Sequence, residues 1–235
     1  MNKICASIGA IDLQTLQRKI HEAFSLGADF IEIRFDYLKI SDVEQAIRIA
    51  ETIKSKAVFT LRSVDQAGKF KGSEAERLDL LKRLSISKPM LLDVEYNTIR
   101  DNDDLADYLD ELNTPILVSW HDFEETPMNE ALLDIINNMR IYSNYAKVVT
   151  TAKDIRDAFR LLDVYENITG LNLIAFAMGE AGVVSRILCT IAGNAPFTYA
   201  AVDRHTTAPG QISLTQMRRL YDRISISCSG KPNAK

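Results

Sequence analysis

The chain has 235 residues, of which 46% are hydrophobic and 26% charged, an ordinary composition for one globular domain. Its net charge of -4, from 28 basic and 32 acidic residues, provides no basic surplus for nucleic-acid binding. No run of 18 apolar residues occurs and the first residues lack the pattern of a secretion signal, so we expect no membrane span and a cytoplasmic location. Cys5, Cys189 and Cys228 have no metal-type spacing, and we expect neither a disulfide nor a cysteine-bound metal.

Short β-branched or apolar runs recur along the chain and predict eight strands. They are Lys3 to Ile8, Phe30 to Phe35, Ala57 to Arg62, Met90 to Glu95, Pro115 to Trp120, Tyr145 to Val149, Asn172 to Ala177 and Phe197 to Ala201. Between them, apolar residues recur at helical spacing, as at Leu13, Leu16 and Ile20. Residues suited to helix ends flank these segments: Ser41 with Glu44, Ser73 with Glu76, Gly27 and Gly170.

Strict alternation of strand and helix predicts parallel strands joined by crossover helices. Eight such units without a change of order predict the α/β class and a single (β/α)8 TIM barrel over residues 1–226, with a doubly wound open sheet as the alternative. The polar tail 227–235 has no periodicity, and we expect it to be disordered.

Polar residues gather at the ends of the predicted strands, which is where a βα barrel carries its active site. Glu32, Arg34 and Asp36 alternate along the second strand and should therefore share one face. Because no strand face of a closed parallel barrel meets bulk water, this face should line a pocket. Further polar residues end the next three strands: Thr60, Arg62, Asp93, Glu95, Ser119, His121 and Asp122.

Lys147 is the most unusual of these residues, because it opens the apolar run Val148-Val149. Burial lowers the pKa of a lysine, and a neutral amine in a closed site attacks carbonyl carbon. The alternative is a lysine that extends to solvent or pairs with a carboxylate. Thr150 and Thr151 follow the run and indicate the start of a helix.

The later strands add further candidates. Met178 follows the seventh strand, although a methionine there is more often part of the core. Arg186 lies one turn into a helix that should begin near Gly182, and it would matter if that helix faced an anion. The loop from Arg204 to Gln211 contains flexible and polar residues, and we expect it to close over substrate as a lid.

The three histidines are scattered over different elements, which argues against a histidine-bound metal. His121 at a strand end is a catalytic candidate, His21 in a predicted helix is not, and His205 favours a surface role. Gly179 and Gly182 resemble a phosphate-binding loop only loosely. A lysine, a histidine, arginines and acidic groups at one rim suit a polyhydroxylated anion that carries a carbonyl group.

The chain resembles the type I 3-dehydroquinate dehydratases of the shikimate pathway from Lys3 to about Ile224. The motifs that carry the resemblance are Glu32-Ile33-Arg34-Phe35-Asp36, Thr60-Leu61-Arg62, Ser119-Trp120-His121-Asp122-Phe123, Lys147, Met178 with Arg186, and Ala208-Pro209-Gly210-Gln211. The resemblance implies a TIM barrel, no metal or organic cofactor, and conversion of 3-dehydroquinate to 3-dehydroshikimate and water. It also implies a homodimer. The small molecule 3-dehydroquinate would be the binding partner, with neither nucleic acid nor membrane involved.

Residue roles follow from the same resemblance. Lys147 would form a Schiff base with the C3 ketone, and His121 would act as general acid and base. Nearby Arg34 and Arg62 would lower the pKa of Lys147 by like charge. The substrate site would comprise Ser7, Glu32, Arg34, Arg62, Met178, Arg186, Thr207 and Gln211, with Arg186 and Gln211 at the carboxylate.

The sequence departs from the family pattern at Gln66, where many bacterial members have a glutamate that helps to position the histidine. Asp65 and Glu95 are the remaining carboxylate candidates for that role. Thr207 stands where bacterial members tend to have serine, which keeps the hydroxyl. Two other functions stay open at this point: a different Schiff-base lyase or class I aldolase on the same barrel, and an inactive barrel that serves as a binding scaffold.

Overall fold

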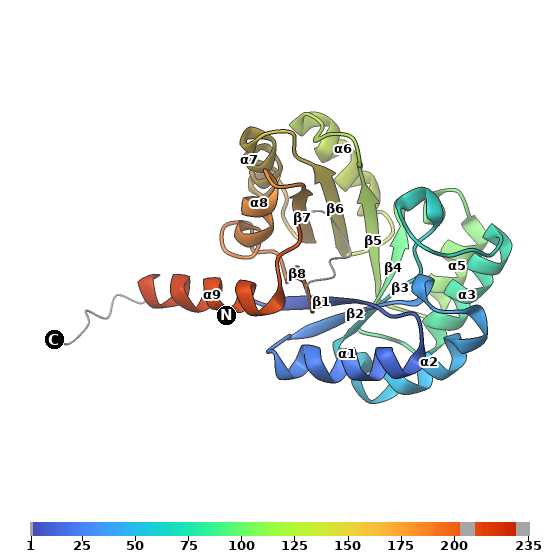
Figure 1. The fold of residues 1–235 in the computed structure, drawn as a ribbon. Coiled ribbons are helices and arrows are strands. Elements are labelled where there is room, and N and C mark those ends of the chain that lie inside the picture. Colours follow the sequence, from blue (N-terminus) through green and yellow to red (C-terminus); the bar gives the residue numbers. More distant parts are fainter. Residues whose placement is uncertain (1, 203–209, 229–235) are drawn as a thin grey trace.

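The eight strands form one parallel sheet that curves into a nearly closed barrel with the helices outside it (Figure 1). The computed structural model describes residues 2–202 and 210–228, with side chains as far as residue 225. The strand order is β7-β6-β5-β4-β3-β2-β1-β8, so each strand from β1 to β7 lies next to its neighbour in sequence. The predicted TIM barrel is confirmed, and the doubly wound sheet is excluded.

The strands lie close to their predicted positions. Their bounds are β1 Ile4–Gly9, β2 Phe30–Arg34, β3 Ala57–Thr60, β4 Leu91–Glu95, β5 Ile116–His121, β6 Tyr145–Thr151, β7 Asn172–Met178 and β8 Thr198–Ala201. The β6 strand continues through Thr150 and Thr151, so the prediction that these hydroxyls begin a helix is wrong. The following helix begins at Ile155, because the Asp154 side chain accepts a hydrogen bond from the Arg156 N–H and caps it.

The helices pack around the outside of the sheet. Their bounds are α1 Leu13–Ser25, α2 Val43–Ala50, α3 Glu74–Ile86, α4 Tyr96–Arg100, α5 Asp103–Glu111, α6 Asn129–Met139, α7 Ile155–Asp163, α8 Val183–Leu188 and α9 Leu214–Cys228. The α9 helix includes the first two residues of the predicted tail, and residues 229–235 lie outside the described part of the chain. Within residues 2–202 and 210–228, no helix combines the length and apolar composition that a membrane crossing requires.

The predicted helix signals were only partly correct. Ser73 and Glu76 form the expected reciprocal capping box of α3. Ser41 does not cap α2, because it lies inside a short 3-10 turn, Ile40–Asp42, that precedes the helix. Gly27 follows α1 at φ +89°, as expected of a helix-terminal glycine, whereas Gly170 at φ +69° lies farther on, in the connection to β7.

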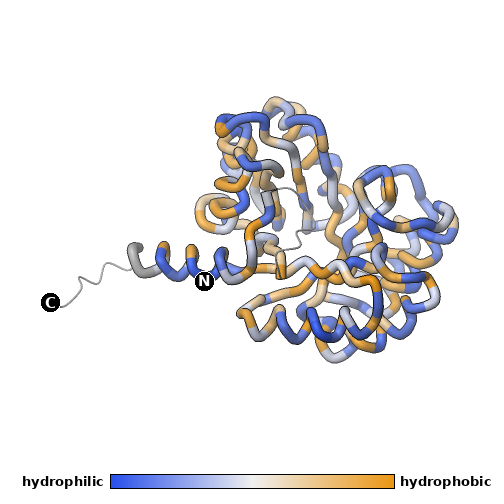
Figure 2. The backbone as a smooth tube through the Cα atoms, in the orientation of Figure 1, coloured by the Kyte–Doolittle hydropathy of each residue, from blue (hydrophilic) through white to orange (hydrophobic). Residues whose placement is uncertain are grey.

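Alternation along the strands separates an outer core from the barrel interior. Ile31 and Ile33 of β2 pack in the larger apolar cluster with the surrounding helices, and Glu32 between them faces the interior. On β6, Ala146 and Val148 face outward while Lys147 faces inward. Hydrophobic and hydrophilic residues interleave along the strands and helices as this arrangement requires (Figure 2). The sheet therefore presents its polar inward positions to one enclosed space.

The barrel seam lies between β7 and β8, which share no ladder among the described residues. The Phe176 and Tyr199 rings contact each other across it, with centroids 6.1 Å apart. The hydroxyl of Ser185 at the start of α8 accepts the Ala177 N–H at 2.8 Å, and the Thr198 hydroxyl donates to the Arg186 carbonyl at 2.7 Å. Side chains thus connect α8 to both strands and fix the backbone of Arg186 at the seam.

Candidate active site

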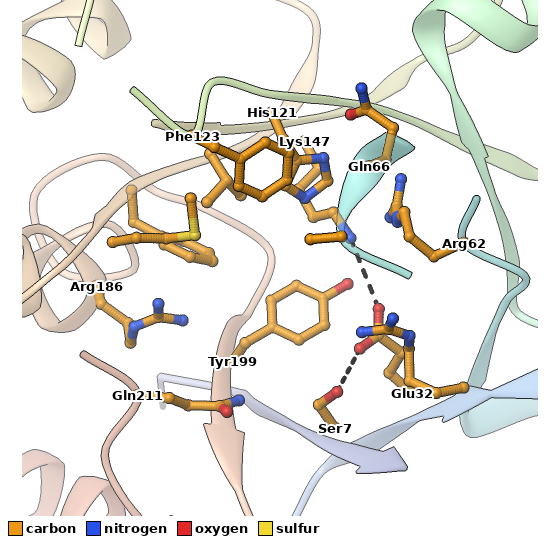
Figure 3. A pocket seen from close by; sticks show the side chains of 15 residues that line it. Ser7, Glu32, Arg62, Gln66, His121, Phe123, Lys147, Arg186, Tyr199 and Gln211 are labelled. Carbon is orange, nitrogen blue, oxygen red and sulfur yellow. Dashed lines mark hydrogen bonds and ion pairs between the residues drawn. The ribbon is translucent and has the colours of Figure 1, made fainter. Parts of the chain in front are cut away.

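A pocket of about 90 Å³ opens at the carboxyl ends of the strands (Figure 3). Its lining consists of Ser7, Glu32, Arg34, Arg62, Gln66, Ala67, His121, Phe123, Lys147, Val149, Phe176, Met178, Arg186, Tyr199 and Gln211. All the predicted site residues that fall within the described ranges line this pocket. Thr207 lies outside the described residues, as do Arg204, His205 and most of the predicted lid, whose closure stays a prediction.

Lys147 lies deep in the pocket and is 4% exposed. Its amine forms an ion pair with the Asp93 carboxylate and lies 3.6 Å from Glu32 Oε1. It also lies 4.9 Å from the centroid of the Tyr199 ring. Arg34 and Arg62, the predicted source of like charge, line the same pocket, but the groups in contact with the amine are two carboxylates, as the alternative interpretation of this lysine has it. The lysine is both paired and directed into the pocket, because a buried ammonium without a partner is costly.

Asp93 of β4 connects three residues of the site. Its Oδ1 accepts hydrogen bonds from Arg62 Nη2 and from the Ser119 hydroxyl, each at 2.7 Å, while Oδ2 contacts Lys147. Burial alone would raise the pKa of Asp93, but the positive charges of Arg62 and Lys147 outweigh it and hold that pKa below its usual value. Asp93 is therefore ionised and serves as the shared acceptor for Arg62, Ser119 and Lys147. Sequence reasoning placed Asp93 at a strand end but did not assign it this role.

Glu32 of β2 is held by hydroxyl groups on the strands to either side. The Ser7 hydroxyl donates to Glu32 Oε2 at 2.5 Å, and the Thr60 hydroxyl donates to Oε1 at 3.0 Å. The strand register places Ser7 of β1 directly beside Glu32, so the backbone fixes the first of these contacts. Together with the nearby Lys147, these donors hold the carboxylate rigidly at the pocket wall.

Arg34 lines the pocket with a fixed guanidinium. Its Nε and Nη2 donate to the two carboxylate oxygens of Asp36 at 2.8 and 2.7 Å. Burial lowers the pKa of Arg34, but the hydrogen bonds and charge of Asp36 outweigh it and raise the pKa. Asp36 itself does not line the pocket, because β2 ends at Arg34 and a 3-10 turn, Phe35–Tyr37, follows. The predicted alternation therefore holds for Glu32 and Arg34 but not for Asp36.

His121 ends β5, where the register pairs it with Val149 of the neighbouring strand β6, two residues beyond Lys147. Its half-buried imidazole stacks on Phe123 with ring centroids 5.7 Å apart. Burial, followed by the positive charges of Arg62 and Lys147, holds the pKa of His121 well below its ordinary value. The imidazole is therefore neutral at neutral pH and able to accept a proton.

Neither carboxylate candidate holds this histidine. Asp65 is exposed outside the pocket lining. Glu95 accepts the Ser63 N–H at 2.9 Å and forms an ion pair with Arg77 of α3. His121 Nδ1 is buried and has no hydrogen-bond partner among the described residues. Gln66 lines the same pocket. Glu95 does not, and its carboxylate instead binds the backbone N–H of Ser63, next to Arg62.

Arg186 provides a cation at the other end of the pocket. It is 2% exposed, and its guanidinium lies 4.1 Å from the centroid of the Phe176 ring. Its Nε and Nη2 atoms have no hydrogen-bond partner among the described residues. Burial lowers the pKa of Arg186 to about 10, which still leaves it charged at neutral pH. A buried cation with unused donors is suited to bind an anion, and the mostly buried Gln211 lines the same pocket.

Phe176 and Tyr199 are lining residues that sequence reasoning did not single out. Both occupy inward positions, on β7 and β8, so strand alternation could have identified them. Apolar and aromatic residues are usual in core strands, which is why they gave no separate signal. Their position matters, because Phe176 lies under Arg186 and Tyr199 lies beside Lys147.

Comparison with known proteins adds an independent line of evidence. The model of the family described as type I 3-dehydroquinase matches residues 4–227. A 3-dehydroquinate dehydratase from Dehalococcoides mccartyi is 37% identical over 215 residues, covering 88% of this chain and 93% of the relative. The solved 3-dehydroquinate dehydratase from Geobacillus kaustophilus is 26% identical with a TM-score of 0.83, covering 99% of this chain and 93% of that one.

The fold is similarly close to the type I 3-dehydroquinate dehydratase from Clostridium difficile, solved with covalently modified comenic acid. That structure has a TM-score of 0.85 at 24% identity and covers 96% of this chain and 93% of its own. The family match, the curated relative and the barrel agree with the resemblance recognised from the sequence motifs. The chain therefore belongs to the type I 3-dehydroquinase family and is an enzyme of the hydro-lyase class that this family represents.

Proposed function

We propose that this enzyme converts 3-dehydroquinate to 3-dehydroshikimate and water, a step of the shikimate pathway, through a Schiff base on Lys147 with His121 as general acid and base. The observation that carries the proposal is the direction of the buried Lys147 amine into a pocket that also contains a neutral histidine. A neutral amine is the nucleophile of Schiff-base chemistry, and a neutral imidazole is a competent base at neutral pH.

The charges of the pocket support one orientation of the substrate. Its carboxylate would bind Arg186 and Gln211, because the unused donors of Arg186 need an acceptor. Its ketone would then face Lys147 on the opposite side of the pocket (Figure 3). The ring hydroxyls would lie among Ser7, Glu32, Arg34 and Arg62, with Met178 as an apolar contact and Thr207 as a further hydroxyl contact.

Imine formation begins when Lys147 Nζ loses a proton and its lone pair attacks the C3 carbonyl carbon. The nitrogen then gives up a second proton, and the carbonyl oxygen takes up two protons in all and leaves as water, giving a protonated imine. Asp93 and Glu32 hold the nitrogen in place before this step and offset its positive charge after it. Because Asp93 is strongly ionised, it serves as a counter-ion, and the proton transfers fall to His121.

Elimination follows from the electron demand of the imine. The protonated nitrogen acidifies the neighbouring C2–H bond, so His121 can remove that proton and leave an enamine. The electron pair then expels the C1 hydroxyl, which leaves as water after accepting a proton from His121. Hydrolysis of the conjugated imine consumes one water and releases 3-dehydroshikimate together with the Lys147 amine. The net change is the loss of one water, with the enzyme unchanged.

Borohydride trapping tests the proposed function directly. Reduction during turnover should leave a stable amine adduct on Lys147, located by peptide mass spectrometry, and Lys147→Met should abolish both the adduct and the absorbance of the conjugated product. Lys153→Met is the matched control, since the Lys153 side chain is 64% exposed and pairs with Glu125 at the surface. Turnover by Lys147→Met, or an adduct at Lys153, would refute the mechanism.

The proposal includes one catalytic domain over residues 1–226 that acts as a homodimer in the cytoplasm. These expectations depend on the family resemblance. Sedimentation equilibrium of the purified chain would give twice the 26.4 kDa of one chain if the dimer forms. A single-chain mass at micromolar concentration would remove the homodimer from the proposal.

A further inference from the structure

Tyr199 of β8 is a pocket residue without an assigned role, and it stands between the two charged ends of the site. Figure 3 shows Arg186 on one side of it and the Lys147–Glu32 pair on the other, with the hydroxyl directed toward that pair. Tyr199 is 5% exposed, and its ring is held by Phe176 and Phe197, at centroid distances of 6.1 and 5.6 Å. Its position is therefore set by packing.

The hydroxyl of Tyr199 is buried, and no described residue forms a hydrogen bond with it. Buried tyrosine hydroxyls usually have a partner, because an unsatisfied one loses its hydrogen bonds to water without replacement. Two other tyrosines of this chain follow that rule. Tyr165 Oη accepts the Ala175 N–H at 2.6 Å, and Tyr221 Oη donates to the Ile187 carbonyl at 3.0 Å. Tyr199 differs from them in facing the pocket.

The surroundings of Tyr199 decide how its hydroxyl can act. Burial, with the negative charge of Glu32 next in effect, raises the pKa of Tyr199 well above its ordinary value. The phenol therefore keeps its proton and acts as a neutral hydrogen-bond donor and acceptor rather than as a base. Packing alone does not require this oxygen, since phenylalanine would fill the same ring position.

We propose that Tyr199 is a substrate-binding residue whose hydroxyl forms a hydrogen bond with the ring hydroxyl on the carbon next to the substrate ketone. The inference rests on the proposed function, which places the ketone at Lys147. The Lys147 amine lies 4.9 Å from the Tyr199 ring centroid, so substituents next to the ketone carbon would come near this side chain. The carboxylate lies at the other end, near Arg186, and the Tyr199 hydroxyl points away from it.

The proposal gives Tyr199 a part in specificity. An α-hydroxy ketone would satisfy the buried phenol, whereas an analogue with hydrogen in place of that hydroxyl would leave it unsatisfied. A site built to hydrogen-bond a substrate hydroxyl rejects analogues that lack it more strongly than an apolar site does. The tyrosine ring would also lie against the positively charged imine nitrogen, a favourable contact for its π face.

A substrate-by-mutant cycle tests the inference. The wild type and Tyr199→Phe are compared on 3-dehydroquinate and on its 4-deoxy analogue, which lacks the hydroxyl next to the ketone. Phenylalanine keeps the ring packing, so kcat/KM for 3-dehydroquinate should fall about 3- to 10-fold, mainly through KM, as expected for one neutral hydrogen bond. On the deoxy analogue the two enzymes should be equal. Equal losses on both substrates, or no loss on 3-dehydroquinate, would overturn the proposal.

Two further measurements separate this inference from its foundation. Dissociation constants for 3-dehydroshikimate and its 4-deoxy counterpart, measured by calorimetry, give the same cycle without turnover. If Tyr199→Phe weakens binding only of the ligand that carries the 4-hydroxyl, the inference is supported even in an inactive enzyme. If the substitution weakens binding of both ligands equally, the inference is refuted. Tyr165→Phe is the matched control, because its hydroxyl bonds only to the Ala175 backbone among the described residues. It should lower the melting temperature and leave the preference between the two ligands unchanged. A changed preference in this control would also count against Tyr199.

Discussion

Asp93 on β4 and Lys147 on β6 form a buried ion pair across the intervening strand β5. Ser119 of that intervening strand donates to the same carboxylate, and the register pairs Ser119 with Lys147. Arg62, two residues beyond the end of β3, completes the group. One carboxylate thus fixes residues of two strands and of the segment after a third, and its loss should affect both the fold and the chemistry.

Asp93→Asn is expected to destabilise the protein strongly. The substitution leaves Arg62 and Lys147 as two buried cations without their shared counter-ion, and breaking a buried pair from one side costs about 3–5 kcal/mol. Urea unfolding at pH 7 should show that decrease in the free energy of unfolding. Asp79→Asn is the control, because the Asp79–Arg83 pair is exposed and should contribute less than about 1 kcal/mol. A change in Asp93→Asn as small as in the control would mean that the pair is not a structural centre.

Stability should decrease in acid through the same buried carboxylates. The pKa values of Asp93 and Glu95 are held below their ordinary values because nearby arginines and Lys147 outweigh the effect of burial. A depressed carboxyl pKa stabilises the fold above the unfolded value of about 4, and this contribution is lost as the pH falls below it. The contribution of these carboxylates to the free energy of unfolding should therefore be level from pH 7 to 5 and decrease from pH 4 downward. His121, whose pKa is depressed in the fold, should add a separate and earlier decrease below about pH 6.5.

Glu95→Gln isolates one part of that acid sensitivity. The glutamine has no charge and does not titrate. The variant should therefore be less stable than wild type at pH 7, because the pairs with the arginines are lost, and its free energy of unfolding should decrease less steeply below pH 4. Unfolding free energies at pH 7, 4 and 3 give the comparison, again with Asp79→Asn alongside. Parallel curves for Glu95→Gln and wild type would show that Glu95 does not contribute to the acid response.

His121→Ala is expected to reduce kcat by roughly 10²- to 10⁴-fold with little change in substrate affinity, because it removes the proposed proton acceptor. The pH profile offers a separate check. Since burial and nearby positive charges lower the pKa of His121, its imidazole stays neutral as the pH falls through 6.5. The acid limb of kcat/KM should therefore lie below pH 6.5. His21→Ala, at an exposed position of α1, should change neither quantity. An acid limb above 6.5 would contradict the assignment.

Sequence reasoning identified most of the pocket because the barrel turns a local pattern into a spatial one. Polar residues at inward strand positions, such as Glu32 and Lys147, must meet once the sheet closes. Sequence reasoning could not identify which polar groups pair. Lys147 and Asp93 are 54 positions apart in the sequence, and their contact depends on how side chains pack across the strands. Tyr199 was missed for a similar reason, since an aromatic residue in a strand gives no sign that its hydroxyl lacks a partner.

Arg186→Met should separate stability from activity. In the ligand-free protein the buried guanidinium leaves two nitrogen atoms without partners among the described residues, so replacing it with an apolar side chain should leave the melting temperature unchanged or raise it. Methionine retains a contact with Phe176. Loss of charge-assisted hydrogen bonds to the substrate carboxylate should lower kcat/KM by about 10- to 150-fold.

The exposed Arg83 of α3 supplies the control for this last prediction. Arg83→Met removes a surface pair with Asp79 and should alter neither activity nor the melting temperature appreciably. Adding 3-dehydroshikimate should raise the melting temperature of wild type and Arg83→Met, because a ligand that binds only the folded state stabilises it. It should have much less effect on Arg186→Met. An Arg186→Met variant that melts well below wild type without ligand, yet gains as much from 3-dehydroshikimate, would mean that this arginine supports the barrel seam rather than the substrate.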